Sequence, residues 1–216
     1  MEKTIVTVHG EARREVPPEQ AVFTVTVSAV DRDKAALVAR INQRATETSA
    51  LLDRYSQAVE RRETTGLQMH PEYNRRGRRA EAYQGSIATT VTVTDFEPLG
   101  ELLYQLAGEE LISISGPWWQ LRPGSRAGAD VRREAVADAL TRAREYATAV
   151  GSELDRILEI ADADTAGGHP MMRAAAFAGG AAEDTAGGFD LSPEQQTVEA
   201  RVLLRVTITE PTLPTP

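Results

Sequence analysis

Residues 20–30 read Gln-Ala-Val-Phe-Thr-Val-Thr-Val-Ser-Ala-Val, and apolar and hydroxyl side chains alternate through this stretch. Positions 21, 23, 25, 27 and 29 are apolar, whereas positions 24, 26 and 28 carry hydroxyls. Because successive side chains of a strand point to opposite faces, the alternation predicts a strand in a sheet that is buried on one face. An earlier strand is predicted at residues 4–16, with Pro17-Pro18 as the turn between the two.

A long amphipathic helix is predicted directly after residues 20–30, with Asp31 as its N-cap. The residues that step by three and four along its predicted inner face are Val38, Ile41, Ala45, Thr48, Leu52, Tyr55 and Val59. This spacing is typical of a helix that packs one side on a sheet.

The remainder of the chain continues the alternation of strands and helices. Strands are expected at about 62–73, 81–94, 111–121, 153–162 and 198–208, and the strand at 111–121 is broken by Gly116-Pro117. A short helix after Asp95 has its core face at Phe96, Leu99, Leu103 and Leu106, with Gly108 as its stop. A helix at about 126–150 has Val136, Leu140, Ala143, Ala147, Val150 and Leu154 on its core face, and Gly151 closes it. The order ββα–ββα–βα–ββ predicts an α+β fold, with antiparallel-rich sheet or sheets and helices packed on one side.

One domain is expected over residues 1–210, either as a single body or as two intertwined lobes. Residues 163–190 are rich in Gly and Ala, and this composition predicts a flexible insertion because it buries little apolar area. The segment 211–216 is a proline-rich tail.

The composition narrows the classes of function. The chain has 216 residues, no cysteine and a net charge of −8. The lack of cysteine excludes disulfides, thiolate metal sites and thiol nucleophiles. The acidic balance argues against a broad nucleic-acid-binding surface, which requires many Lys and Arg side chains. No apolar stretch approaches the length of a membrane span, and no signal segment precedes the first strand, so we expect a cytoplasmic protein.

Several short motifs resemble the SIMPL-domain family, which includes bacterial periplasmic immunogenic proteins. They are Val6-Thr-Val-His-Gly10 followed by Pro17-Pro-Glu-Gln-Ala21, then Thr65-Gly-Leu-Gln-Met-His-Pro-Glu-Tyr73 with Tyr83-Gln-Gly85, then the Ala-rich helix from Ala135 to Gly151, and finally Ser192-Pro193 with the last strand. The resemblance covers nearly the whole chain. It implies a two-part α+β fold without an agreed set of catalytic residues, and some family members assemble into ring- or channel-like oligomers.

Catalytic and metal-binding motifs are not found. The histidines are His9, His70 and His169, and none has a further ligand at the spacing of a metal motif. A Ser–His–acid site at His70 is conceivable, but the GxSxG turn is absent. Gly124-Ser-Arg-Ala-Gly128 precedes a helix without either glycine-rich phosphate motif, so we interpret it as a loop and cap. We expect no cofactor, and we assign no catalytic or metal-binding residue.

Two groups of residues are candidates for binding. Arg75, Arg76, Arg78 and Arg79 form a basic cluster at a predicted hairpin tip, either a possible anion contact or a solvated turn. The aromatic residues Tyr73, Tyr83, Trp118 and Trp119 are the candidate interface or ligand contacts. Successive strand residues face opposite sides, and a bulge at Gly116-Pro117 would turn Trp119 toward the core and Trp118 outward. Without a bulge, Trp118 continues the face of Ile112 and Ile114 instead. The remaining alternative is that both rings are buried under the helix at 126–150.

The leading hypothesis is a non-enzymatic, self-associating SIMPL-like protein that forms a homo-oligomer and serves as an assembly or interaction module. It depends on the long alternating strands, whose edges can pair with another chain. The first alternative is a small-ligand-binding protein with a pocket formed by the four aromatic residues. The second is a hydrolase that uses His70.

Overall fold

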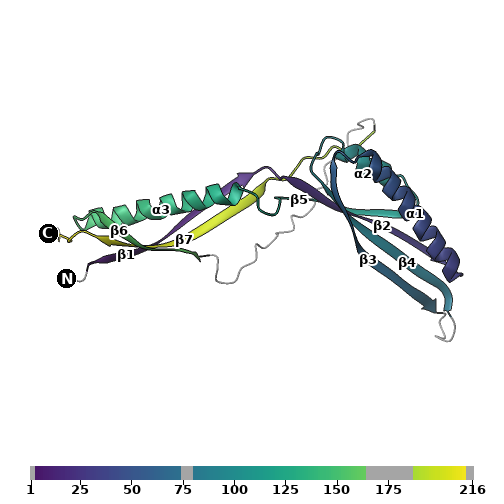
Figure 1. Ribbon diagram of the computed structural model, residues 1–216, viewed down its shortest axis with the longest axis horizontal. Coiled ribbons are helices and arrows are strands. Elements are labelled where there is room, and N and C mark those ends of the chain that lie inside the picture. Colours follow the sequence, from purple (N-terminus) through teal and green to yellow (C-terminus); the bar gives the residue numbers. More distant parts are fainter. Residues whose placement is uncertain (1–2, 74–79, 164–186, 213–216) are drawn as a thin grey trace. The chain divides into compact units, whose positions relative to one another are not determined.

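The computed structural model describes residues 3–73, 80–163 and 187–212. These ranges form two antiparallel sheets and three helices (Figure 1), which confirms the α+β class. The elements are β1 (Ile5–Val16), β2 (Gln20–Asp31), α1 (Lys34–Arg54), β3 (Val59–Tyr73), β4 (Ala80–Val93), α2 (Leu99–Ala107), β5 (Ile112–Gln120), α3 (Ala127–Ala149), β6 (Leu154–Asp162) and β7 (Gln196–Ile208). Their order matches the order predicted from the sequence.

The strands are divided between two compact units. Sheet A has the order β1-β7-β6 and carries α3, whereas sheet B has the order β3-β4-β2-β5 and carries α1 and α2. Pro17-Pro18 lies between β1 and β2 as predicted, but the two strands do not pair with each other, because they lie in different sheets. Along its whole length β1 pairs with β7 instead, from Ile5 opposite Thr207 to Val16 opposite Gln196.

The core of the sheet B unit lies between the sheet and α1 and α2. It includes Phe23, Val25, Val91 and Val93 of the strands, all of which are buried. The buried residues of α1 are Leu37, Ile41, Thr48, Leu51 and Leu52. Those of α2 are Leu99, Gly100, Leu102, Leu103 and Leu106.

The predicted inner face of α1 needs two corrections. Leu37 is fully buried and Val38 only partly. The N-cap is Asp33 and not Asp31. The Asp33 side chain accepts a hydrogen bond from the Ala36 N–H at 2.8 Å, while Asp31 accepts one from the Asp33 N–H at 2.9 Å. At the other end the helix stops before Val59, which begins β3.

The core of the sheet A unit depends on close contact between α3 and β1. The buried face of α3 consists of Val131, Ala135, Ala139, Ala143 and Ala147. The predicted Val136 and Leu140 are only partly buried, and Leu154 begins β6. Because most of these side chains are small, the helix can lie close to the sheet. At Gly10 an added Cβ would lie 2.2 Å from the carbonyl oxygen of Ala135.

Parts of the sequence predictions fall beyond the described residues. Residues 164–186, most of the predicted insertion, and residues 74–79, with the arginine cluster, lie outside the described ranges. The chain from Gly187 onward contacts α2, where the Phe189 N–H donates to the Gly100 carbonyl oxygen at 3.2 Å. Within the described part of the chain, no helix is long and apolar enough to cross a membrane.

Candidate interaction surface

The histidines do not form a catalytic or metal site in the described parts of the chain. His9 lies on β1 and His70 on β3, and both are exposed. Among residues 3–73, 80–163 and 187–212, His70 has no serine or carboxylate partner, and no group of three potential metal ligands occurs. His169 lies outside these ranges. A hydrolase site at His70 therefore gains no support from the geometry.

The two tryptophans point to opposite faces of sheet B. Trp118 pairs with Val22 and is 45% exposed, whereas Trp119 pairs with Ala21 and packs on the core. The rings of Trp119 and Phe96 meet edge to face, with their centroids 5.0 Å apart. The pairing shifts register between Val22 and Thr24, opposite Gly116-Pro117. This shift confirms the bulge and the inward orientation predicted for Trp119.

The four predicted aromatic residues do not converge on one pocket. Trp119 pairs with Ala21 at one end of β2, and Tyr83 on β4 pairs with Asp31 at the other. At about 3.3 Å per residue, ten residues of strand separate these positions by roughly 33 Å. Tyr73 ends β3 and is 61% exposed.

A depression of 420 Å³ lies instead at the ends of α1 and α2. It is lined by residues that include Leu51, Arg54, Tyr104 and Phe189. Nearby, burial raises the pKa of Tyr55, and the neighbouring Glu101 carboxylate raises it further. Because α1 and α2 contact each other, the residues around the depression are part of the helix packing.

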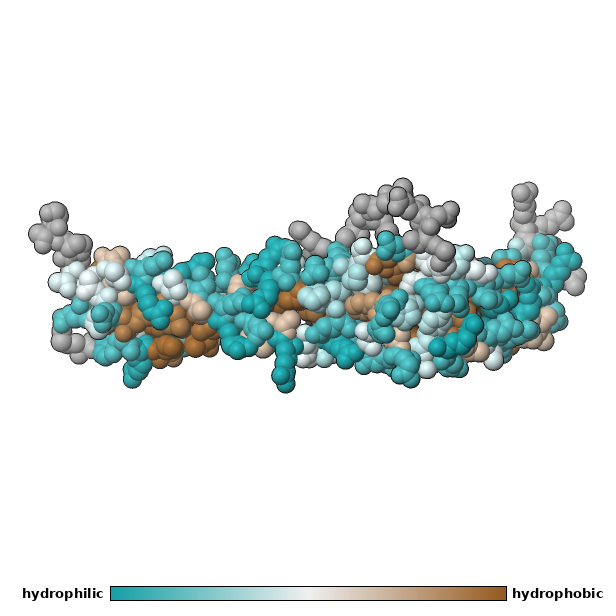
Figure 2. All heavy atoms as spheres, turned by 90° about the horizontal axis from the view of Figure 1, so that it is seen from above, coloured by the Kyte–Doolittle hydropathy of each residue, from teal (hydrophilic) through white to brown (hydrophobic). Residues whose placement is uncertain are grey.

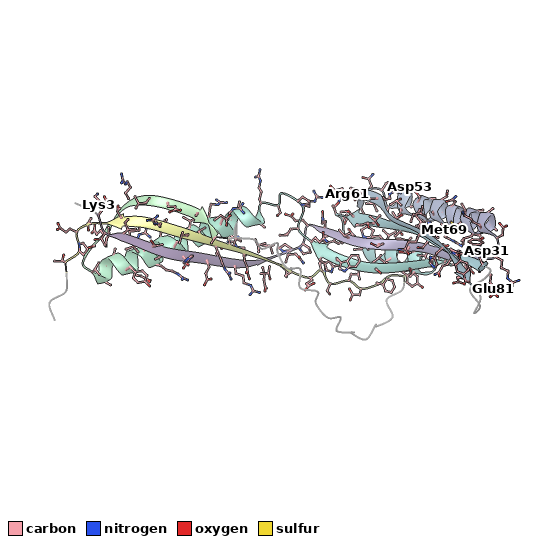
Figure 3. The ribbon with its side chains drawn as sticks, turned by 90° about the horizontal axis from the view of Figure 1, so that it is seen from below. Lys3, Asp31, Asp53, Arg61, Met69 and Glu81 are labelled. Carbon is pink, nitrogen blue, oxygen red and sulfur yellow. The ribbon has the colours of Figure 1, made fainter. Side chains whose placement is uncertain are left out.

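An uncovered apolar row runs along β3, and we call Leu67, Met69, Pro71 and Tyr73 the β3 row. These residues alternate with Gln68, His70 and Glu72. Such alternation is typical of a strand with one buried face. Nevertheless Leu67 is 71% exposed, Met69 38% and Tyr73 61%. Met69 is labelled on this strand in Figure 3.

The position of α1 explains why the β3 row is exposed. The helix packs on β2 and β4 (Figure 1), and an added Cβ at Gly85 of β4 would lie 2.8 Å from Ile41 Cδ1. β3 is the next strand outward and the edge of the sheet. Only near its start does it reach the helix, where Arg62 Nη2 lies 2.7 Å from Asp53 Oδ1.

The other sheet edges carry features that oppose pairing with a further strand. β1 bears Glu11, Arg13, Arg14 and Glu15, and the Glu11 N–H is already bonded to Asp138 Oδ2 of α3 at 3.0 Å. β5 is short and contains Pro117, which has no N–H to donate. In contrast, β3 is 15 residues long, and Thr64 to Pro71 contains no Asp, Glu, Lys or Arg. Charges and prolines are the usual protection of a sheet edge. β3 carries charges toward both ends and a proline at Pro71, so its least protected stretch is Thr64 to His70.

The edge strand β6 also exposes apolar side chains, but it is strongly charged. Ile157 is 48% exposed, Leu158 41% and Ile160 52%, and hydrophobic atoms gather on this unit in Figure 2 (left). The charged residues of the strand are Asp155, Arg156, Glu159 and Asp162. Its pairing with β7 shifts register twice and that of β3 with β4 shifts three times, so the charge of β6 is what distinguishes the two edges.

The sequence of the β3 row was a usable signal. Its period-two alternation can be read from residues 67–73, but its exposure depends on where α1 lies.

Comparison with protein families gives one match, to SIMPL, described as a protein of unknown function (DUF541), over residues 6–206. No curated protein matches the chain.

Proposed function

The chain belongs to the SIMPL family, and from this premise we propose that it is a non-enzymatic, self-associating assembly or interaction module whose copies meet along β3. The single observation that carries the proposal is the β3 row, an alternating apolar face on a long edge strand that is uncharged from Thr64 to Pro71. Covering this row removes apolar surface from water, at about 25 cal/mol for each Å². A second copy supplies both a matching row and a strand for the free backbone groups.

Antiparallel pairing about a two-fold axis is the simplest arrangement of two β3 strands. An axis through Gln68 places Leu67 of one copy opposite Met69 of the other, twice by symmetry. An axis perpendicular to the sheet keeps both apolar rows on the same side, between the two α1 helices. The two four-stranded sheets then become one continuous sheet.

The test is the mass of the protein in solution, measured by light scattering over micromolar concentrations. We expect a homo-oligomer, and we expect Leu67→Lys/Met69→Lys to reduce it to the 23.5 kDa protomer while circular dichroism stays unchanged. The matched control is Ile157→Lys/Ile160→Lys, which places the same charges on β6 and keeps the mass of the wild type. A wild-type protein that is monomeric throughout the range would contradict the proposal. So would dissociation by the β6 variant alone.

The register is tested by crosslinking, because the natural chain has no cysteine. Gln68→Cys places the new thiol next to its symmetry mate, since directly opposed residues in an antiparallel pair have Cβ atoms about 4.5–5.5 Å apart. Mild oxidation is expected to give a covalent dimer on a non-reducing gel. Glu159→Cys on β6 is the control and stays uncrosslinked.

A further inference from the structure

The face of sheet B opposite α1 and α2 is built from small, uncharged side chains, and we call it the hydroxyl face. Except for Val22 and Ala88, every member carries a hydroxyl group. The members are Val22, Thr24, Thr26 and Ser28 of β2, Ser86, Ala88 and Thr90 of β4, and Ser113 and Ser115 of β5. Thr92 of β4 lies on the same side of the sheet but is buried. Both helices of the unit pack on the other face of the sheet.

The hydroxyls lie in register across neighbouring strands. Thr24 pairs with Thr90 and Ser28 with Ser86 between β2 and β4, and Thr26 pairs with Ser113 between β2 and β5. The Oγ1 atoms of Thr24 and Thr90 are 3.4 Å apart, and Thr65 Oγ1 of β3 lies 3.1 Å from the same Thr90 atom. Each hydroxyl has one hydrogen to donate and two lone pairs, so it retains bonding capacity beyond these contacts.

An exposed indole stands at one end of the hydroxyl face. Trp118 pairs with Val22 and is 45% exposed. Along β3, longer polar side chains border the same face, among them Arg61, which is labelled in Figure 3, and Glu63. Their charges pair with each other, since Arg61 Nε lies 3.2 Å from Glu63 Oε2.

The corresponding face of sheet A is quite different in chemistry. It carries ion pairs between neighbouring strands, with Arg13 Nε 3.7 Å from Glu199 and Arg205 Nη1 3.1 Å from Glu159. The uncharged surface on β2, β4 and β5 therefore differs from the corresponding face of sheet A and is not a general feature of the solvent-facing sides of this protein.

The geometry points to the hydroxyl face as a binding surface for a neutral polysaccharide chain, with Trp118 as its stacking residue. Sugar hydroxyls can replace water as partners of the threonine and serine side chains, and the C–H face of a sugar ring packs on an indole. From Val22 to Ser28 the face extends for roughly 20 Å, enough for several sugar rings.

Other ligand classes match the hydroxyl face less well. Protein interfaces depend on a cluster of buried aromatic, apolar or Arg anchors, and this face offers one large side chain, Trp118. An anionic polymer requires basic residues, whereas the face contains none and the chain has a net charge of −8.

The test is affinity electrophoresis in native gels that contain hydroxyethyl cellulose, laminarin or dextran, with calorimetry on cellohexaose. We expect retardation by at least one neutral polymer and at least a tenfold loss of affinity in Trp118→Ala. Thr26→Val, which removes one hydroxyl at nearly constant volume, is expected to weaken binding several-fold. Tyr146→Ala is the control, because Tyr146 is an equally prominent aromatic residue, 62% exposed, on the other unit.

Each alternative outcome overturns the proposal. No retardation by any of the three polymers excludes it, as does retardation by an anionic polysaccharide such as polygalacturonate alone. Binding that survives both Trp118→Ala and Thr26→Val lies elsewhere on the protein. A change of oligomeric mass in Trp118→Ala shows that a second copy covers this face. Because Leu67→Lys/Met69→Lys leaves the hydroxyl face intact, that variant binds the polysaccharide even if self-association along β3 is disproved.

Discussion

At the scale of single residues, Gly10 determines how closely α3 packs on sheet A. A side chain there would meet backbone atoms of α3, with Ala135 O at 2.2 Å and Ala139 N at 2.5 Å from the added Cβ. Neither neighbour is a flexible side chain that can rotate away. The requirement therefore concerns space, and it explains why the strand Val6-Thr-Val-His-Gly10 ends its apolar run on glycine.

We predict that Gly10→Ala separates α3 from β1 and costs about 3 kcal/mol or more, at the upper end of overpacking effects. The measurement is chemical denaturation. Gly66→Ala is the control, because the nearest atom to an added Cβ there is Ala88 Cβ, at an ordinary 3.6 Å. Equal stability of the two variants would contradict the packing described for Gly10.

The tryptophan pair gives a second prediction at this scale. Trp119→Ala removes a ring that packs on the sheet B core and on Phe96, and we expect a loss of about 3 kcal/mol. Trp118→Ala removes an exposed ring, and the melting temperature of the protomer stays nearly unchanged. Similar losses in the two variants would show that both rings are buried.

At the scale of elements, the alternation of strands and helices was predictable because its signals are local. The periods of two and of three to four identified each element in order. On the inner face of α1, Ile41, Thr48 and Leu52 are buried as predicted. Val38 was assigned to this face in place of Leu37 because both are apolar and periodicity alone does not choose between them. In α3, Val136 and Leu140 were assigned to the buried face because they are larger and more apolar than the alanines. The alanines occupy that face instead, because the helix lies too close to Gly10 for large side chains to fit.

The partners of the strands were not predictable from local patterns. Nothing within β1 indicates that it pairs with β7, nearly the whole chain away, and not with the adjacent β2. The candidate surfaces show the same limit. The inward orientation of Trp119 followed from a local break in β5, whereas the exposure of Leu67 depends on the distant placement of α1.

The edge of sheet A supplies a prediction about pH. Hydrogen bonds from Lys3 Nζ at 2.6 Å and from Thr207 Oγ1 at 2.9 Å lower the pKa of Asp155. A lowered pKa in the folded state stabilises the protein above the unfolded value of about 3.9, and this contribution is lost as the pH falls through the folded pKa. We therefore expect Asp155→Asn to melt below the wild type at pH 7 and the difference to shrink toward pH 3. Thermal melts at both values measure this, and a constant difference would refute the assignment.

At the scale of the whole molecule, the chain has separate cores. Leu204 belongs to the core of the sheet A unit, and Leu52 to that of the sheet B unit. Two-state unfolding is the usual behaviour of one cooperative core, and it need not hold when cores are separate.

We predict that Leu204→Ala and Leu52→Ala each cost about 2–5 kcal/mol and that each lowers the melting transition of its own unit. Differential scanning calorimetry is the measurement, with hydrogen exchange in the two sheets to assign the transitions. A single transition that shifts as a whole in both variants would show that the units unfold together.

The pairing of β1 with β7 also has a consequence for synthesis. The chain emerges from the ribosome with β1 first, and the strands and helices of the sheet B unit are complete once Gln120 has appeared. Sheet A can form only after Thr207 has been made, because β7 is both the central strand of that sheet and the last of the described elements. Domains tend to fold as they are made, whereas pairing across such a long sequence separation is slow. Of the two units, the one that contains β1 is therefore the last to fold, and any truncation before residue 196 leaves β1 without its partner.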